Sequence, residues 1–126
     1  MIEFEGFVLE DGTPIYQQIL LYLKRGIAGG GIRDGDELPS RRMLSALLGV
    51  NPNTVQKAYR QLEEEGLIQS RTGAKSCVVV EKTTAKTVGN ELLQSDVKAV
   101  IRVMKQSGVS REDALQLLSD LWEVEE

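Results

Sequence analysis

Apolar residues recur at steps of three and four in the first half of the chain, which predicts three successive helices. The first helix is expected to begin with Thr13 as its cap and Pro14 at its first position, and to stop at the glycines of 29–31. The second follows the capping residue Ser40 and ends at Gly49. The buried stripe of the first helix is Ile15, Ile19, Leu23 and Ile27, and the second helix carries Leu44, Leu47 and Leu48.

The third helix, expected over residues 51–66, has the most informative polar face of the chain. Asn51 is a good N-cap, Pro52 suits the first helical position, and Gly66 can take the left-handed turn that ends a helix. The buried stripe is Val55, Ala58, Tyr59 and Leu62, and the polar residues left outside are Asn53, Thr54, Gln56, Lys57, Arg60 and Gln61. Side chains of these types match base edges and phosphate oxygens, although the polar face of a lone helix is more often simply solvated.

The next segment predicts a small β-hairpin. Residues 67–70 and 76–80 are rich in β-formers and flank the stretch 71–75, which gives a strand, loop, strand pattern. Two helices joined by a tight glycine-containing turn make a helix-turn-helix, whose second helix enters the DNA major groove. With the hairpin as a wing, the order of the elements predicts a winged helix.

Four runs of sequence carry a resemblance to a known family. They are PIYQQI at 14–19, GDELPSRRMLS at 35–45, GVNPNTVQKAY at 49–59 and LEEEGLI at 62–68. In this order they resemble the GntR family of bacterial transcription regulators over roughly residues 12–80, and NPNTVQKAY with the short remaining tail resembles its small YtrA-type subgroup. The resemblance implies that a dimer binds a palindromic operator near a promoter, most often as a repressor.

The resemblance and the helix geometry together predict roles on DNA. Arg41 and Arg42 begin the second helix and are expected to clamp phosphates or reach a guanine edge, with Arg42 favoured by the resemblance. The start of the third helix is expected near bases, and the wing near the minor groove or phosphates. Many relatives carry basic residues at Pro52, Gln56 and Ala74, so those contacts do not transfer. The predicted DNA-binding residues are Ser40, Arg41, Arg42, Asn51, Asn53, Thr54, Gln56, Lys57, Arg60, Arg71, Thr72, Gly73 and Lys75.

Residues 81–126 form the second predicted unit. After a polar linker at 81–87, apolar residues at steps of three and four predict one helix that stops at Gly108 and another that starts at Ser110. These helices have more apolar surface than a hairpin can cover, so packing on a second copy of the chain is expected, and packing wholly within one chain is the alternative. The predicted dimer-interface residues are Val88, Leu92, Leu93, Val97, Val100, Ile101, Met104, Leu117, Leu118, Leu121 and Trp122.

Charge is unevenly distributed along the chain. The formal net charge is −4, which at first argues against a nucleic-acid partner. Residues 39–75, however, carry six basic and three acidic side chains, a net charge of +3, whereas the segment from Glu81 onward carries six basic and nine acidic ones. The predicted DNA face is therefore basic, and most of the acidity lies in the C-terminal segment.

Composition excludes several kinds of function. With no histidine and the single Cys77, the chain offers no zinc-ligand set, no internal disulfide and no Ser-His or Cys-His pair, so no metal, cofactor or catalysis is expected. No apolar run approaches the ~18 residues of a membrane helix, and no secretory signal is recognisable, which predicts a cytoplasmic protein without membrane contact. The C-terminal segment is too short for the ligand pockets of larger relatives, so a small-molecule effector, if one exists, is expected at the dimer or domain interface.

The sequence thus predicts a mainly α fold with a small antiparallel β-wing. A winged helix-turn-helix domain at 1–80, with its core at 12–80, is followed by a two-helix dimerisation region at 81–126. The expected function is that of a homodimeric, sequence-specific repressor on double-stranded operator DNA, with helix 51–66 in the major groove and the wing 71–75 at the minor groove. The alternative is a winged-helix module that docks a protein partner through its C-terminal helices and has no DNA specificity.

Overall fold

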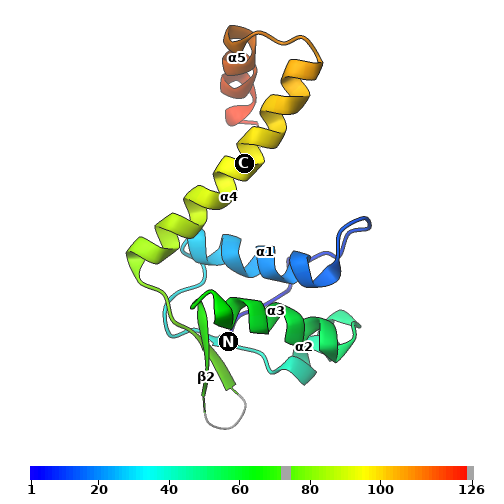
Figure 1. Ribbon diagram of the computed structural model, residues 1–126, viewed down its shortest axis with the longest axis vertical. Coiled ribbons are helices and arrows are strands. Elements are labelled where there is room, and N and C mark those ends of the chain that lie inside the picture. The colour runs from blue at the N-terminus through cyan, green and yellow to red at the C-terminus, as the bar shows by residue number, and fades with distance from the viewer. Residues whose placement is uncertain (72–74, 125–126) are drawn as a thin grey trace. The chain divides into compact units, whose positions relative to one another are not determined.

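The computed structural model describes residues 1–71 and 75–124 and divides into two compact units, Met1–Asn90 and Glu91–Glu126. The elements in chain order are α1 (Ile15–Ala28), β1 (Glu37–Leu38), α2 (Arg41–Leu48), α3 (Pro52–Glu64), β2 (Ile68–Arg71), β3 (Lys75–Val78), α4 (Lys82–Gln106) and α5 (Arg111–Trp122). Figure 1 shows α1, α2 and α3 gathered together in the first unit. The mainly helical chain with a small antiparallel sheet confirms the predicted fold class.

The described strands form a small antiparallel sheet in the order β1-β3-β2. Strands β2 and β3 pair from Ile68 opposite Val78 to Arg71 opposite Lys75, which confirms the two strands of the predicted wing. On the other edge of β3, the short strand β1 adds the pair of Glu37 with Cys77. The sequence did not predict β1, because two residues are too few to show the alternation of a strand.

Helices α2 and α3 begin and end as predicted. The Ser40 hydroxyl and the Asn51 side chain each accept a hydrogen bond from a backbone N–H of the following first turn, at 3.1 and 2.8 Å. Gly49 and Gly66 follow the two helices with φ angles of 66° and 76°, a left-handed conformation that costs glycine little. Local sequence signals therefore determine where each of the two helices begins and ends.

Helix α1 begins at Ile15 rather than Pro14, and Pro14 takes the capping position that was predicted for Thr13. Gln18 accounts for the difference. Its amide nitrogen donates to the carbonyls of Thr13 and Glu10, at 2.8 Å each, and its amide oxygen accepts from the Glu10 N–H at 2.8 Å. A side chain from inside the helix thus holds the preceding segment, and the Thr13 hydroxyl is not used as a cap.

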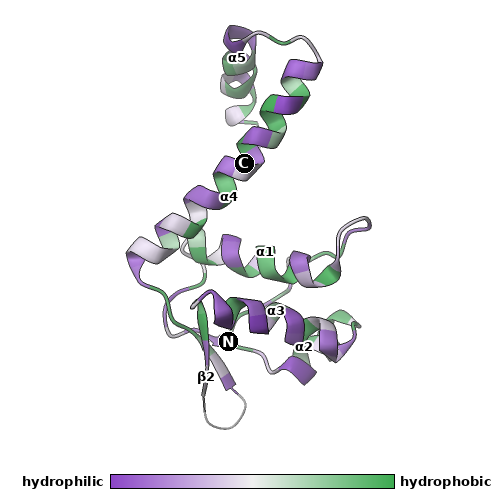
Figure 2. Ribbon diagram, in the orientation of Figure 1, coloured by the Kyte–Doolittle hydropathy of each residue, from purple (hydrophilic) through white to green (hydrophobic). Residues whose placement is uncertain are grey.

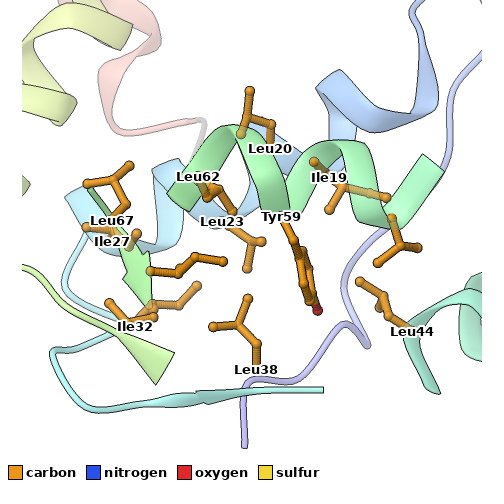
Figure 3. Packing of buried hydrophobic residues seen from close by; sticks show 14 of the residues in the cluster. Ile19, Leu20, Leu23, Ile27, Ile32, Leu38, Leu44, Tyr59, Leu62 and Leu67 are labelled. Atoms are coloured by element: carbon orange, nitrogen blue, oxygen red, sulfur yellow. The ribbon is translucent and has the colours of Figure 1, made fainter. Parts of the chain in front are cut away.

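The core of the first unit is built by one face of each of α1, α2 and α3 together with the sheet. Ile19, Leu23, Leu44 and Leu62 are all at most 2% exposed. Figure 3 shows Tyr59 pointing from α3 into the cluster that these side chains form. The buried stripe predicted for α3 is thus confirmed, as is that of α1 except for the half-buried Ile15.

Of the three leucines expected on α2, Leu47 is 66% exposed. Ser45 is buried, and its hydroxyl donates to the Val50 carbonyl at 2.5 Å. The inner face of α2 therefore runs through Leu44, Ser45 and the half-buried Leu48, and Leu47 lies to the side of it.

Helix α4 begins earlier than predicted. The polar linker expected at 81–87 is wrong, because the chain is helical from Lys82 onward. The first turns of α4 belong to the first unit and pack on its core: Val88 is half-buried there, and a Cβ added to Gly89 would lie 3.1 Å from the Ala28 Cβ. This tertiary contact explains why a polar stretch with weak periodicity forms helix.

The ends of the C-terminal helices follow the prediction. Gly108, with φ of 75°, ends α4, and the Ser110 hydroxyl caps α5 by accepting from the Asp113 N–H at 3.1 Å. The first compact unit extends to Asn90, past the domain boundary predicted at residue 80. Within the described ranges, no helix combines the length and apolar character needed to cross a membrane.

Candidate nucleic-acid interface

The outward face of α3 carries polar side chains opposite its buried stripe. Among the predicted DNA-binding residues of this helix, Asn51, Asn53, Lys57 and Arg60 are exposed, and Thr54 and Gln56 are half-buried. The first turn of this fully described helix contains no acidic residue, so the partial positive charge of its N-terminus is not neutralised there. Such a helix end favours phosphate oxygens and base acceptors.

The start of α2 presents one arginine to solvent and holds the next against the protein. Ser40 and Arg42 are exposed, so both predicted contacts are accessible. Arg41 is half-buried: its Nη2 lies 3.3 Å from Glu63 Oε1, and its Cζ lies 5.2 Å from the centre of the Tyr59 ring. Two adjacent arginines thus have different surroundings.

Tyr59 supports Arg41 from the core side. Its hydroxyl donates to the Pro39 carbonyl at 2.8 Å, and its side chain is fully buried. Burial raises the pKa of the Tyr59 phenol well above its ordinary value, and the positive charge of Arg41 opposes this only in part. The phenol therefore remains a protonated donor at neutral pH.

Two of the predicted contact residues on α3 already have partners within the protein. Lys57 Nζ lies 4.0 Å from the centre of the Tyr16 ring, a cation–π contact between α3 and α1. The Asn51 side-chain oxygen is engaged in capping, because it accepts from the Asn53 N–H. Any contact of these two side chains with DNA has to coexist with these interactions or replace them.

The wing is described only in part. Thr72 and Gly73 lie outside the described residues, as does the side chain of Arg71. The Lys75 side chain is 68% exposed, and its Nζ lies 3.4 Å from Glu37 Oε1. An ion pair this exposed contributes at most about 1 kcal/mol, so Lys75 can exchange the carboxylate for a phosphate at small cost.

The acidic residues at the end of α3 are partly neutralised. Glu63 pairs with Arg41, and Glu65 pairs with Lys24 of α1 at 2.6 Å, while Glu64 is exposed. In the part of the chain that the structure describes, no group of three or more acidic or cysteine side chains could hold a metal ion.

The second unit presents an apolar surface. Figure 2 shows hydrophobic residues recurring along α4 and α5. Within this unit the two helices line an open groove of about 680 Å³. Leu115, 56% exposed, lines it too and was missed, although its step of three to Leu118 was an available signal. Of the predicted dimer-interface residues, Leu93, Val97, Val100, Ile101, Leu117, Leu118, Leu121 and Trp122 are exposed, and Val88, Leu92 and Met104 are half-buried.

Known proteins match both the sequence and the fold. The family described as "Bacterial regulatory proteins, gntR family" matches residues 15–78. The HTH-type transcriptional repressor YtrA of Bacillus subtilis (strain 168) is 33% identical over 110 residues, which cover 86% of this chain and 85% of that protein. The chain belongs to the GntR family. This GntR protein is a DNA-binding transcription regulator and not an enzyme.

Solved structures of GntR-type proteins agree in fold. A GntR family transcriptional regulator from Listeria monocytogenes is 30% identical to this GntR protein with a TM-score of 0.81, covering 89% of this chain and 98% of that chain. AraR(DBD) in complex with operator ORX1 is 28% identical with a TM-score of 0.50, covering 61% of this chain and 93% of that chain. The family resemblance expected from the sequence is confirmed.

Proposed function

We propose that this GntR protein is a repressor that binds a palindromic, double-stranded operator as a homodimer in the bacterial cytoplasm. Helix α3 enters the major groove with its N-terminal end toward the bases, and the wing lies at the minor groove. The observation that carries the proposal is the outward face of α3. It leaves Asn53 and Arg60 exposed and starts at an N-terminus capped by Asn51.

The exposed side chains suit two kinds of contact with DNA, one with base edges and one with phosphates. Asn53 stands in the first turn of α3, and an amide can donate to and accept from one adenine edge, so it is placed for base recognition. Arg42 and Arg60 carry guanidinium groups that suit phosphates or guanine. Lys75 adds a positive charge at the wing. Among the other predicted contacts, Ser40 caps α2, and Thr54, Gln56 and Lys57 lie on α3.

The names of similar proteins support this assignment. The YtrA relative is named a repressor, and AraR(DBD) was solved with operator DNA. The name of the YtrA relative supports repression as the direction of control, and the AraR(DBD) complex supports binding to an operator.

A palindromic operator needs a twofold protein. The apolar residues of α4 and α5 support a second copy as the partner, because Ile101 and Leu118 are 43% and 48% exposed and face the groove of the second unit. Side chains of this kind gain about 1.5–3 kcal/mol each when they are fully buried. The interface between two copies is also where an effector is expected to bind, if the protein has one.

Fluorescence anisotropy tests the proposal, with DNA from the protein's own promoter region and a scrambled duplex compared at several salt concentrations. We expect a preference for the promoter duplex of about 10³-fold or more, and weaker binding at high salt. Arg42→Ala and Asn53→Ala should each weaken specific binding by about 1–3 kcal/mol. The control is Arg33→Ala, the same substitution at an exposed arginine in the loop before β1.

Sites selected from random sequence supply the operator if the promoter fragment lacks it, and they should show half-sites about one helical turn apart. If no duplex is preferred and neither variant differs from wild type, operator binding is excluded. The surviving hypothesis is then the protein-docking module, in which substitution of Leu93, Ile101 or Leu118 abolishes capture of a partner.

A further inference from the structure

One carboxylate joins three elements of the winged helix. Glu63, in the last turn of α3, accepts a hydrogen bond from Arg41 Nη2 at 3.3 Å and another from the Ser70 hydroxyl. Arg41 is the first residue of α2, and Ser70 lies in β2. Glu63 Oε1 therefore connects the start of α2, the end of α3 and the first strand of the wing.

The Arg41 guanidinium is held from a second side by the core. It lies over the ring of Tyr59, which is fully buried, and the Tyr59 hydroxyl binds the carbonyl of Pro39, two residues before Arg41. The Arg41 side chain is only 26% exposed, and within the described part of the chain its buried Nε meets no hydrogen-bond acceptor. The guanidinium is thus committed to contacts inside the winged helix.

We infer that Arg41 and Glu63 are positioning residues, which fix α2, α3 and the wing in the arrangement that DNA requires. The inference rests on the operator binding proposed above. An arginine already paired with a carboxylate brings little net charge to a phosphate and releases few counterions. The adjacent Arg42, which is exposed, takes the phosphate or base contact at this end of α2.

The three joined elements each carry a proposed DNA contact. Arg42 follows Arg41 on α2, Arg60 lies one turn before Glu63 on α3, and Arg71 follows Ser70 in β2. Specific binding needs these contacts at the same time, whereas non-specific binding depends mainly on charge. Loss of the Glu63 link should therefore lower binding to the operator more than binding to other DNA.

Hydrogen exchange of the free protein tests the structural part of the inference. We compare Glu63→Gln with Glu64→Gln, which removes the same charge from the next, exposed residue. The amides of β2 and β3 should exchange faster in Glu63→Gln and remain unchanged in Glu64→Gln, because it is the Glu63 carboxylate that accepts the hydrogen bond from Ser70 of β2. Equal protection of these strands in the two variants would overturn the inference.

DNA binding tests the functional part, with Arg41→Gln, Glu63→Gln and the double variant measured on the operator and on a scrambled duplex. Each single substitution should weaken operator binding about tenfold. The double variant should bind the operator about as tightly as the weaker-binding single variant, because the effects of two substitutions in one linked pair are not additive. Glu63→Gln should lose affinity for the operator although it removes a negative charge near DNA. Glu64→Gln should keep wild-type affinity or bind slightly more tightly.

The salt dependence separates positioning from contact. Arg42→Gln should reduce the slope of log K against log salt by about one, whereas Arg41→Gln should leave it unchanged. A reduced slope in Arg41→Gln, or operator binding by Glu63→Gln as tight as that of Glu64→Gln, would overturn the inference. Circular dichroism verifies that Arg41→Gln is folded, and Glu63→Gln provides a second, independent variant. If wild type prefers no duplex, the proposed function fails, and the exchange rates alone decide whether Glu63 positions the wing.

Discussion

The helices of the winged helix and those of the C-terminal unit follow the same apolar period but differ in burial. In α3, Val55 and Leu62 have no exposed surface. In α5, Leu117 and Leu118 follow a comparable stripe, yet 45% and 48% of their surface is exposed. Among the described residues of α4 and α5, none is fully buried.

This contrast shows that periodicity specifies an apolar face but not the surface that covers it. Three helices and a sheet can enclose a core within one chain, whereas two helices leave an outer apolar side without a partner. The stability of the winged helix should therefore not depend on protein concentration, while order in the C-terminal unit should depend on it if a second copy provides the cover.

The largest effect is expected from a cavity in the winged-helix core. Leu23→Ala removes a side chain that is 2% exposed and should lower the free energy of unfolding by about 2–5 kcal/mol. Urea unfolding followed by circular dichroism measures this loss, and the loss should be the same at different protein concentrations. The matched control is Leu47→Ala in α2, where 66% of the side chain is already exposed and a change of about 0.5 kcal/mol or less is expected. Similar losses in the two variants would contradict the assignment of the core.

A charge placed in the apolar face of the C-terminal unit should weaken the association of two copies rather than the stability of the winged helix. Val97→Asp places a carboxylate in the groove of α4 and α5 and should raise the dimer dissociation constant about a hundredfold or more, because a buried, unpaired charge costs several kcal/mol. Sedimentation equilibrium measures the constant. Ser95→Asp introduces the same charge on the opposite side of α4 and should leave association unchanged. A monomeric wild-type protein would remove the basis of this prediction and of the proposed homodimer.

Predictions from the sequence succeeded where the determining signal is local. Ser40 and Asn51 cap their helices through bonds within one turn, and Gly66 needs only its own backbone freedom to end α3. Predictions failed where distant residues decide. The strand β1 exists because β3 pairs with it, and residues 82–87 are helical in a segment that packs on the core of the first unit through Ala85 and Val88.

The same distinction applies to the candidate DNA site. Residue types and helix positions identified Arg41 and Arg42 together as candidates. The family resemblance favours Arg42, but only the fold shows how the two surroundings differ, because Glu63 and Tyr59 lie far from Arg41 in sequence and contact it through the packing of α2 on α3. No local pattern encodes these contacts, so the half-burial of Arg41 beside the exposed Arg42 could not be predicted from the residues themselves.

A smaller effect is expected from the buried aromatic residue of the winged helix. Tyr59 is fully buried, and burial raises the pKa of its phenol. Below about pH 10 the phenol is protonated in the folded and the unfolded protein. Above about pH 10 the unfolded chain loses this proton first, so the free energy of unfolding should fall by up to about 1.4 kcal/mol per pH unit. Tyr59→Phe should be less stable at neutral pH, because the Pro39 carbonyl loses its donor, but should decline less steeply in alkali. Urea unfolding between about pH 9 and pH 11 measures both slopes, and equal slopes would refute a role for Tyr59.

The smallest effect comes from two serine caps with the same local geometry, one in each region. Ser40 and Ser110 each accept a hydrogen bond from a first-turn N–H at 3.1 Å, so Ser→Ala should cost about 1 kcal/mol at either site. The core of the winged helix is enclosed within one chain. Ser40→Ala should therefore lower the urea midpoint of unfolding by the same amount at all protein concentrations. If a second copy covers α5, as proposed, Ser110→Ala should weaken association, and its effect on helicity should shrink as protein concentration rises. A concentration-independent loss in Ser110→Ala would mean that α4 and α5 are held within a single chain, which is the alternative that the exposed faces of these helices argue against.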